Sequence, residues 1–388
     1  MYDFQGALKD IKNKGLYREF RNVNAAQGPY TVIDGRKMLM MSSNNYLGLC
    51  DDIRLKRAAI ESIRKFGVGA GGSRLTCGNF ELHRELEERL AKFKDVESCI
   101  VFGSGYAANI GAISGIADKN WVIFCDRLNH ASIVDGIRLS GAKLVVYKHC
   151  DMEDLESKIV RYHTGKSLIV TDGVFSMDGD VAPVDRIVKL AKKYNLMTMV
   201  DDAHATGILG EKGRGTSEYF GLKDAVDISM GTLSKAFGVE GGFVAGKRKL
   251  VDFLRHKAKS FIYSTAPPPH NMAAALEALN IIETEPQARK ELAEKSVWLR
   301  NRLIEKGFNV PKGVTPIIPL MVGDVNTAVE FSMLLYNEGI YIPAIRPPTV
   351  PKGTSRLRIS IMASHSYEDM EFALKNLVRF GRKLGIIP

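Results

Sequence analysis

The sequence predicts an α/β protein with a mostly parallel seven-stranded sheet in a large domain and a small α+β domain at the C-terminus. Seven short apolar runs between Cys99 and Ala245 alternate with helical patterns, as in a parallel sheet that helices cover on both faces. This alternation of strands and helices ends before the last hundred residues, and a chain of 388 residues is long for one core. We therefore expect a helix and hairpin segment at 1–50, a large domain at 51–285 and a small domain at 286–388.

The N-terminal elements are predicted from amphipathic patterns and turn formers. Residues 4–22 have the pattern of a charged amphipathic helix, and residues 30–41 that of a hairpin around the turn pair Asp34-Gly35. Two helices follow. The second, Glu81–Phe93, has leucine at every fourth position, so that its apolar residues share one face.

Short apolar runs mark the strands of the large domain. Runs of this length are typical of strands buried on both faces of a sheet. Helical patterns fill most of the gaps, and in Pro183–Tyr194 the proline suits a position in the first turn. The predicted strands are Cys99–Phe102, Trp121–Cys125, Leu144–Tyr147, Leu168–Thr171, Met197–Val200, Ile228–Met230 and Phe243–Ala245.

The C-terminal residues have the mixed pattern of a smaller α+β unit. A helix near 286–306 precedes predicted strands near 315–322, 340–345 and 356–362, and a last helix follows. The sequence contains no internal repeat and no low-complexity segment.

Composition argues against several classes of protein. The formal net charge is +10, but the basic residues are dispersed, so we expect no nucleic-acid partner. The positive charge either keeps the protein soluble or attracts an acidic substrate or an acidic carrier protein. The five cysteines include no CxxC pair, which speaks against a disulfide framework or structural zinc and favours a reducing cytoplasm. No apolar run reaches about 18 residues, so neither a signal peptide nor a membrane span is expected.

A lysine, an acid and a histidine are expected to meet at one edge of the sheet. Lys235 lies in a hydroxyl-rich turn after one predicted strand, and Asp201 and His204 end the strand before it. Open α/β sheets bind their ligands at this edge. Pyridoxal phosphate needs a lysine for its aldehyde, hydroxyls for its phosphate and an acid beside its pyridine nitrogen. The alternatives for Asp201 are a helix cap and a metal ligand, although no third ligand cluster is obvious.

Two glycine clusters raise the alternative of a dinucleotide. Gly103–Ala108 follows a strand, opens a helix and fits GxGxxA, and Asp126 ends the next strand near the spacing of a ribose-binding acid. That pattern is compatible with an NAD-dependent oxidoreductase, but the same loop geometry holds any phosphate. Gly67–Gly72 fits GxGxxG after a helical pattern, which is the wrong context. The lysine, acid and histidine favour pyridoxal phosphate over NAD.

Further polar side chains are expected near the same edge. His130 opens the helix after a strand, where it either caps that helix or places an aromatic face over a cofactor ring. Asp172 and Ser176 end the strand before the acid, where a tight turn is the alternative. Arg358 belongs to an alternating Arg-x-Arg that is more often a solvated strand face, yet a guanidinium holds a carboxylate with two hydrogen bonds.

Together these segments resemble the α-oxoamine synthase family of fold-type I pyridoxal-phosphate enzymes. The resemblance extends from Gly15-Leu16-Tyr17-Arg18 to Arg379–Gly385, almost the whole chain. The segments that carry it are SSNNYLG at 42–48, LNHASIVDG at 128–136, TDGVFSMDG at 171–179, VDDAHATG at 200–207 and GTLSKA at 231–236.

Three other segments indicate a branch within the family. GGSRLTCGN at 71–79, RGTSEYFG at 214–221 and AIRPPTV at 344–350 are most similar to the branch that makes 8-amino-7-oxononanoate for biotin. This implies condensation of L-alanine with pimeloyl-CoA or a pimeloyl carrier protein, with loss of CoA and CO2. The alternative is the branch that condenses glycine with acetyl-CoA, or a member with both activities. The choice of amino acid, the acyl carrier, the acyl length and the role of Asp172 stay open.

The resemblance also implies roles for individual residues. Lys235 would be the Schiff-base lysine and later the proton-transfer base. Asp201 would pair with the pyridine nitrogen and His204 with the phenolic oxygen, while His130 would stack on the ring and line the substrate site. Ser176 would contact the cofactor. The phosphate would lie among Ser104, Gly105, Tyr106, Thr232 and Ser234.

The implied substrate and subunit contacts come from segments far apart in the chain. Asn44 and Arg358 would hold the carboxylate of the amino acid, and Arg18 and Thr349 would lie along the acyl channel. Thr265 would reach the phosphate of the neighbouring subunit's cofactor, so that a homodimer has its active site at the interface. No metal is implied.

Overall fold

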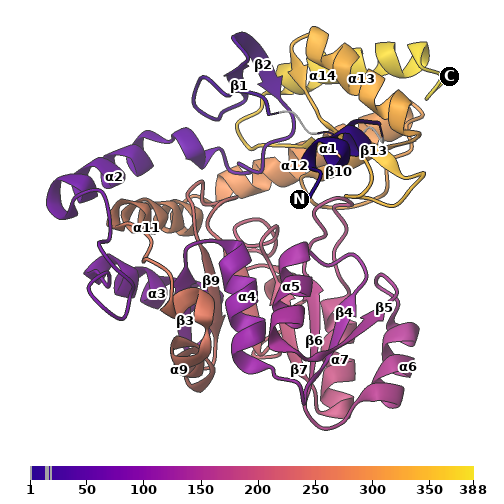
Figure 1. The fold of residues 1–388 in the computed structure, drawn as a ribbon. Coiled ribbons are helices and arrows are strands. Elements are labelled where there is room, and N and C mark those ends of the chain that lie inside the picture. The colour runs from indigo at the N-terminus through magenta and orange to yellow at the C-terminus, as the bar shows by residue number, and fades with distance from the viewer. Residues whose placement is uncertain (1, 14–16, 18–19) are drawn as a thin grey trace.

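A seven-stranded sheet organises the middle of the chain in the computed structural model, which describes residues 2–13, 17 and 20–388 (Figure 1). Its order is β3-β9-β8-β7-β6-β4-β5, with β9 antiparallel to both neighbours and the other neighbouring strands parallel. The predicted fold class and all seven predicted strands are confirmed. The strands are β3 Ser98–Phe102, β4 Val122–Asp126, β5 Lys143–Tyr147, β6 Ser167–Asp172, β7 Met197–Asp201, β8 Ile228–Thr232 and β9 Gly242–Gly246.

Helices cover both faces of this sheet because successive side chains of a strand point to opposite sides. In β4, Ile123 and Cys125 pack with α4, α5 and α9, whereas Val122 and Phe124 pack with α6 and α7. Continuous burial on both faces explains the uninterrupted apolar runs. The covering helices are α4 Gly105–Ile116, α5 Ala131–Ser140, α6 Met152–Tyr162, α7 Val184–Tyr194 and α9 Arg248–Lys257, and Pro183 stands just before α7.

Two three-stranded sheets lie outside the central one, with orders β10-β13-β12 and β1-β2-β11. The predicted single strand at 340–345 is wrong: it is divided between these two sheets, because Pro343 interrupts it. Helix α13, Val325–Asn337, was not among the expected elements. The strands are β1 Tyr30–Ile33, β2 Arg36–Met40, β10 Ile317–Gly323, β11 Ile340–Tyr341, β12 Ala344–Ile345 and β13 Ser355–Ser360.

The first helix, α1 Phe4–Asn13, is shorter than the predicted 4–22. Residues 20–22 are not helical, and the backbone N–H of Asn22 donates to the Asp34 carboxylate over 2.9 Å. The hairpin turn thus holds Arg21 and Asn22 outside the helix, which local periodicity did not indicate. The predicted hairpin itself is confirmed, with both turn residues at positive φ.

The remaining helices pack against the sheets or against one another, and α2 lies beside α11 (Figure 1). None of the helices in the described ranges combines the length and apolar character that crossing a membrane requires. The division of the chain at residues 50 and 285 stays a prediction. These helices are α2 Ile53–Phe66, α3 Glu81–Lys94, α8 Thr216–Tyr219, α10 Lys259–Ile262, α11 Pro269–Thr284, α12 Pro286–Glu305 and α14 Tyr367–Lys383, with a 3-10 turn at Leu49–Asp51.

Candidate active site

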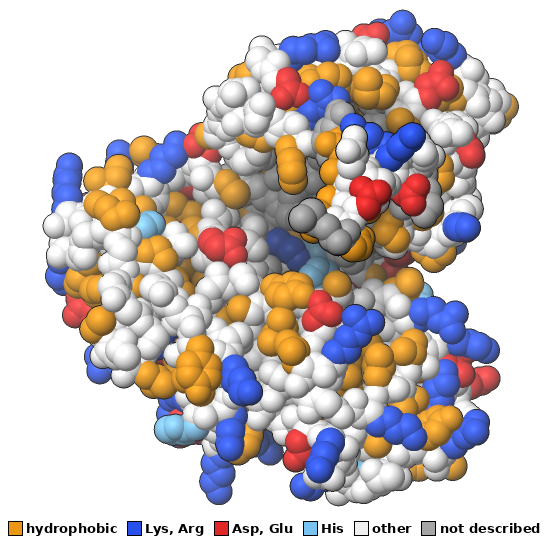
Figure 2. Space-filling view, viewed as in Figure 1, with side chains coloured by type: hydrophobic (Ala, Val, Ile, Leu, Met, Phe, Trp, Pro, Cys, Tyr) orange, Lys and Arg blue, Asp and Glu red, His pale blue; other side chains and the backbone are white. Residues whose placement is uncertain are grey.

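A cavity of about 210 Å³ lies at the carboxyl edge of the seven-stranded sheet, where several strands and the loops that follow them end. Figure 2 shows a hollow between the upper and lower parts of the molecule on this face. The cavity collects the side chains that the sequence placed at the strand ends. The predicted residues that line it are Ser104, Gly105, Tyr106, His130, Ser176, Asp201, His204, Thr232, Ser234 and Lys235.

Lys235 carries an amine that is easier to deprotonate than an ordinary lysine. Burial lowers its pKa to about 8, against the attraction of Asp201 and Asp172, and the guanidinium of Arg358 lowers it further. A less protonated amine is a better nucleophile and base. Asp172 responds in the opposite direction, since burial first and then the charge of Asp201 raise its pKa well above the usual range.

Asp201 is fixed by two hydrogen bonds at the end of β7. Its Oδ1 accepts from the backbone N–H of Ala203 over 2.9 Å, and its Oδ2 accepts from Asn109 Nδ2 over 2.6 Å. The side chain therefore closes a turn rather than capping a helix. The metal alternative also finds no support here, because the one grouping with metal-ligand spacing in the described part of the chain contains His149 and Cys150 instead.

His130 has a defined tautomer. Its Nδ1 lies 3.3 Å from the backbone N of Ser132, which can only donate, and 2.7 Å from the hydroxyl of the same serine. Nδ1 is therefore an acceptor, and the ring proton lies on Nε2. Burial lowers the pKa of His130, which agrees with a neutral ring. Ser132 Oγ also accepts from Asn109 Nδ2 over 2.8 Å, so one amide links His130 to Asp201.

His204 belongs to a hydrogen-bond network that reaches the C-terminal sheet. Its Nδ1 lies 2.7 Å from the hydroxyl of Tyr46, and Arg358 Nη2 donates to that hydroxyl over 3.4 Å and to Asn44 Oδ1 over 3.1 Å. Burial raises the pKa of Tyr46, so its hydroxyl stays protonated between His204 Nδ1 and Asn44 Oδ1, which lies 3.2 Å away. Burial, and then the charges of Lys235 and Arg358, lower the pKa of His204 well below its usual value.

The arginines of β13 are buried, so the solvated-face alternative is wrong. Arg358 is 6% exposed, and its Nε donates to the carbonyl of Ser176 over 2.5 Å. Arg356 is 3% exposed and pairs with the Asp178 carboxylate. Both guanidinium groups thus fasten the C-terminal sheet to the loop after β6, and Arg358 stands next to the cavity through the carbonyl of Ser176, a residue that lines it.

Backbone N–H groups and two hydroxyls lie together at the start of α4. Ser104 is the N-cap, and its hydroxyl accepts from the N–H of Ala107 over 3.1 Å. The earlier N–H groups of a helix have no partner within it and attract anions. The hydroxyls of Thr232 and Ser234 lie 2.8 Å apart. A Cβ at Gly105 would lie 3.2 Å from Thr232 Oγ1, so glycine permits this close approach.

Other predicted residues lie outside the cavity lining. Thr265 and Thr349 are exposed, and Thr265 forms an isolated bridge with Ser73. Asn44 reaches the site through Tyr46 and Arg358. The predicted Arg18 falls outside the described residues.

Sequence reasoning missed Tyr46, Asn109 and Ser132 as site residues. Tyr46 stands in the SSNNYLG segment. Asn109 comes directly after the Gly103–Ala108 loop, and Ser132 comes two residues after His130. Their proximity in the chain to recognised residues was the available signal.

The aminotransferase class I and II family matches residues 36–377 of the chain. The 8-amino-7-oxononanoate synthase of Lysinibacillus sphaericus is 51% identical over 99% of this chain and 99% of that protein. A serine palmitoyltransferase from Sphingomonas wittichii has a TM-score of 0.95 at 33% identity, covering 100% of this chain and 98% of that one. An SPT solved with PLP has the same TM-score at 32% identity and 99% coverage of each chain. The likeness therefore includes every segment that lines the cavity.

Proposed function

The chain belongs to the aminotransferase class I and II family, and on that premise we propose that it condenses L-alanine with pimeloyl-CoA or a pimeloyl carrier protein. The product is 8-amino-7-oxononanoate, formed with release of CoA, or of the carrier, and CO2 in biotin biosynthesis. The observation that carries the proposal is the convergence of Lys235, Asp201, His204 and His130 in one cavity beside a helix N-terminus.

The cofactor is pyridoxal phosphate, and the residues of the cavity fit it. Asp201 offers a carboxylate to a protonated pyridine nitrogen, and Lys235 offers an amine of lowered pKa to the aldehyde. The start of α4, with Thr232 and Ser234, offers N–H and hydroxyl donors to the phosphate. When bound, pyridoxal phosphate supplies a protonated ring that stabilises negative charge at the α-carbon of the amino acid.

Lys235 moves the protons of the proposed reaction. Its Nζ takes the proton from Cα of alanine and later returns one to the same carbon, which a pKa of about 8 makes possible near neutral pH. Between these steps the α-carbon attacks the thioester, the thiol leaves, and the original carboxylate is lost as CO2. Arg358 and Asn44 hold that carboxylate before it leaves, as a guanidinium can do with two hydrogen bonds. The two side chains are neighbours, because Arg358 Nη2 donates to Asn44 Oδ1 over 3.1 Å.

The histidines orient the reactants. His130 presents an Nε2–H group, because Nδ1 is occupied by Ser132, and so acts as a neutral hydrogen-bond donor. His204 is held by Tyr46 and is expected to bond the phenolic oxygen of the cofactor. A neutral ring at both positions avoids placing a second cation against Lys235, whose amine must lose its proton.

Product identification tests the proposed reaction. The purified protein is given alanine or glycine with pimeloyl-CoA or acetyl-CoA, and the products are identified by mass spectrometry. We expect 8-amino-7-oxononanoate from alanine and pimeloyl-CoA, together with visible absorbance of the bound cofactor. Lys235→Ala should lose both the absorbance and the turnover, whereas Lys119→Ala, at an exposed lysine, should keep them. A colourless protein that binds nicotinamide nucleotides, or full turnover by Lys235→Ala, would contradict the proposal.

We further propose a homodimer in the cytoplasm. Thr265 is exposed, and its neighbour Tyr263 is 81% exposed, which suits a surface that a second subunit covers. The five cysteines are free, in keeping with a reducing compartment. Light scattering should give the mass of two chains, and Thr265→Ala should weaken cofactor binding without changing that mass. A monomer at micromolar concentration with full activity would refute the shared site.

A further inference from the structure

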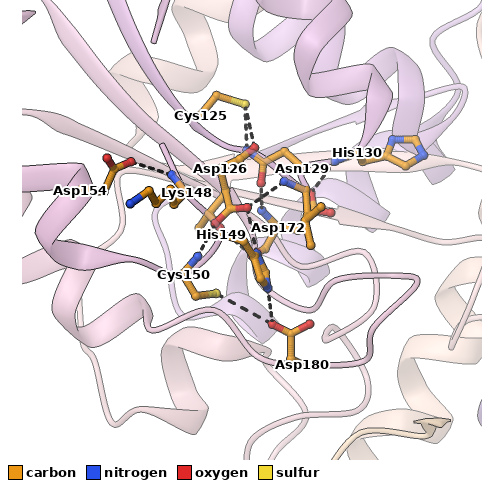
Figure 3. Close-up of polar contacts among 12 residues, drawn as sticks. Cys125, Asp126, Asn129, His130, Lys148, His149, Cys150, Asp154, Asp172 and Asp180 are labelled. Atoms are coloured by element: carbon orange, nitrogen blue, oxygen red, sulfur yellow. Dashed lines mark hydrogen bonds and ion pairs between the residues drawn. The ribbon is translucent and has the colours of Figure 1, made fainter. Parts of the chain in front are cut away.

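His149 lies between two carboxylates beside the proposed active site (Figure 3). Its Nδ1 is 3.0 Å from Asp126 Oδ1, and its Nε2 is 2.9 Å from Asp180 Oδ2. The ring packs edge-on against Phe175 with 4.4 Å between the ring centroids. His149 follows β5, Asp126 ends β4, and Asp180 and Phe175 belong to the loop after β6, so one ring joins three strand ends.

Both ring nitrogens of His149 face acceptors, which requires a proton on each. The ring is therefore an imidazolium. Burial opposes the charge, but the hydrogen bonds to Asp126 and Asp180, with the side chain of Cys150 adding to them, raise the pKa of His149 to about 12. The cation balances two carboxylates that would otherwise face each other, one of them only 2% exposed.

The same cluster has ligand spacing that a metal ion could use, since donor atoms of Asp126, His149 and Cys150 lie within 4.8 Å of one another. The hydrogen bonds argue against that use. Asp126 Oδ1 accepts from Leu128 N over 2.8 Å as well as from His149, and its Oδ2 accepts from Cys150 N over 2.8 Å. Both carboxylate oxygens of Asp126 and both ring nitrogens of His149 already form hydrogen bonds within the protein.

One carboxylate of this cluster shapes the loop that carries His130. Asp126 anchors Leu128 N, and Asn129 in the same loop accepts from the backbone N–H of Asp172 over 2.9 Å. The N–H of His130 then donates to Asp172 Oδ1 over 3.3 Å, as Figure 3 shows. The position of the His130 ring therefore depends on where the Asp126 carboxylate is held.

The second carboxylate shapes the loop that carries Ser176. Asp180 lies four residues after Ser176, and the backbone N–H of Phe175 donates to the carbonyl of Asp180 over 3.1 Å. The carbonyl of Ser176 accepts from Arg358. A displacement of Asp180 would thus reach both a cavity-lining serine and the arginine assigned to the substrate carboxylate.

We propose that His149 is a positioning residue, a cationic clamp between Asp126 and Asp180 that sets the relative position of the His130 loop and the Ser176 loop. The inference deepens the proposed function and rests on it, because the two loops matter through the groups they present to cofactor and substrate. His149 itself is not assigned any contact with either.

A double-mutant cycle tests the clamp with the holoenzyme. His149→Gln and Asp180→Asn are compared with the double variant, and His256→Gln, at an exposed histidine, is the matched control. We expect His149→Gln to lower kcat by about tenfold to a hundredfold, as small misplacements near reacting groups do. The visible circular dichroism of the bound cofactor should change as well, since it reports the asymmetry of the ring's surroundings. The double variant should be no worse than His149→Gln, because the link is already broken and one uncompensated carboxylate is removed.

The outcomes separate the clamp from the function. Unfolding of the four cofactor-free proteins in urea gives the coupling between residues 149 and 180 without any turnover. Strictly additive effects with unchanged circular dichroism would overturn the clamp, and so would stoichiometric zinc in the wild-type protein that His149→Gln lacks. If the wild-type protein makes no 8-amino-7-oxononanoate, the proposed reaction is refuted. If the unfolding free energies of the four proteins are still non-additive in that case, the clamp remains as a structural link.

Discussion

Replacing Lys235 by methionine should stabilise the cofactor-free protein. The pKa of Lys235 falls from 10.5 in the unfolded chain to about 8 in the folded protein, chiefly through burial. Between these values the unfolded state binds one more proton than the native state, so the stability of the wild type rises with pH through this window. Methionine has a similar length and no proton to lose, and it removes that dependence.

The magnitude follows from the size of the pKa shift. A fall of the pKa from 10.5 to about 8 means that the wild type should be less stable than Lys235→Met by roughly 3 kcal/mol near pH 7, because each tenfold change in acidity is worth about 1.36 kcal/mol. The difference should shrink to about 1.4 kcal/mol near pH 9.5 and vanish above the unfolded pKa. The Lys235 side chain is half-buried where it faces the cavity, so solvent screening makes these values upper limits.

Urea unfolding of the cofactor-free proteins across this pH range measures the effect. Lys119→Met, at an exposed lysine, is the control and should show no such slope. A stability difference that is constant between pH 7 and 9.5 would refute the reasoning, because it would mean that the amine titrates alike in the native and unfolded states. A difference of the opposite sign would mean that carboxylates near Lys235 outweigh its desolvation.

Three further predictions concern residues around the cavity. Asp172→Asn should keep turnover near the wild type and raise Tm by an amount that grows from pH 4 to 7. Burial and Asp201 raise the pKa of Asp172, so the wild type must take up a proton to fold and loses stability as the pH rises, whereas asparagine does not. A lower Tm of the variant near pH 7 would contradict this. Tyr46→Phe should cost about 1–3 kcal/mol in the free energy of unfolding, since it leaves buried His204 Nδ1 without its partner; chemical denaturation measures it, and no loss would mean that the bond is weak. Arg358→Lys should raise KM for the amino acid by roughly tenfold to a hundredfold, the equivalent of one charged hydrogen bond; steady-state kinetics with an unchanged KM would place the carboxylate elsewhere.

Much of the sheet could be predicted because its strands are short and buried on both faces. Val122–Asp126 and Ser167–Asp172 are fully buried, so their apolar runs were continuous and their ends fell at polar residues. The start of the chain and residues 340–345 were harder. Arg21 and Asn22 are held by Asp34, and Pro343 divides a strand between two sheets. Neither effect leaves a periodic pattern in the sequence.

The sequence by itself determined which residues reach the carboxyl edge of the sheet. Parallel strands place their ends at one edge, so Asp201 and Lys235 had to come near each other once the strands were recognised. Only the tertiary structure decided how the C-terminal sheet meets that edge. Arg358 contacts Asn44 across 314 residues of sequence, and its burial turns an apparently solvated Arg-x-Arg into part of the site. Such contacts depend on how whole sheets pack together, which the spacing of residues along one strand does not record.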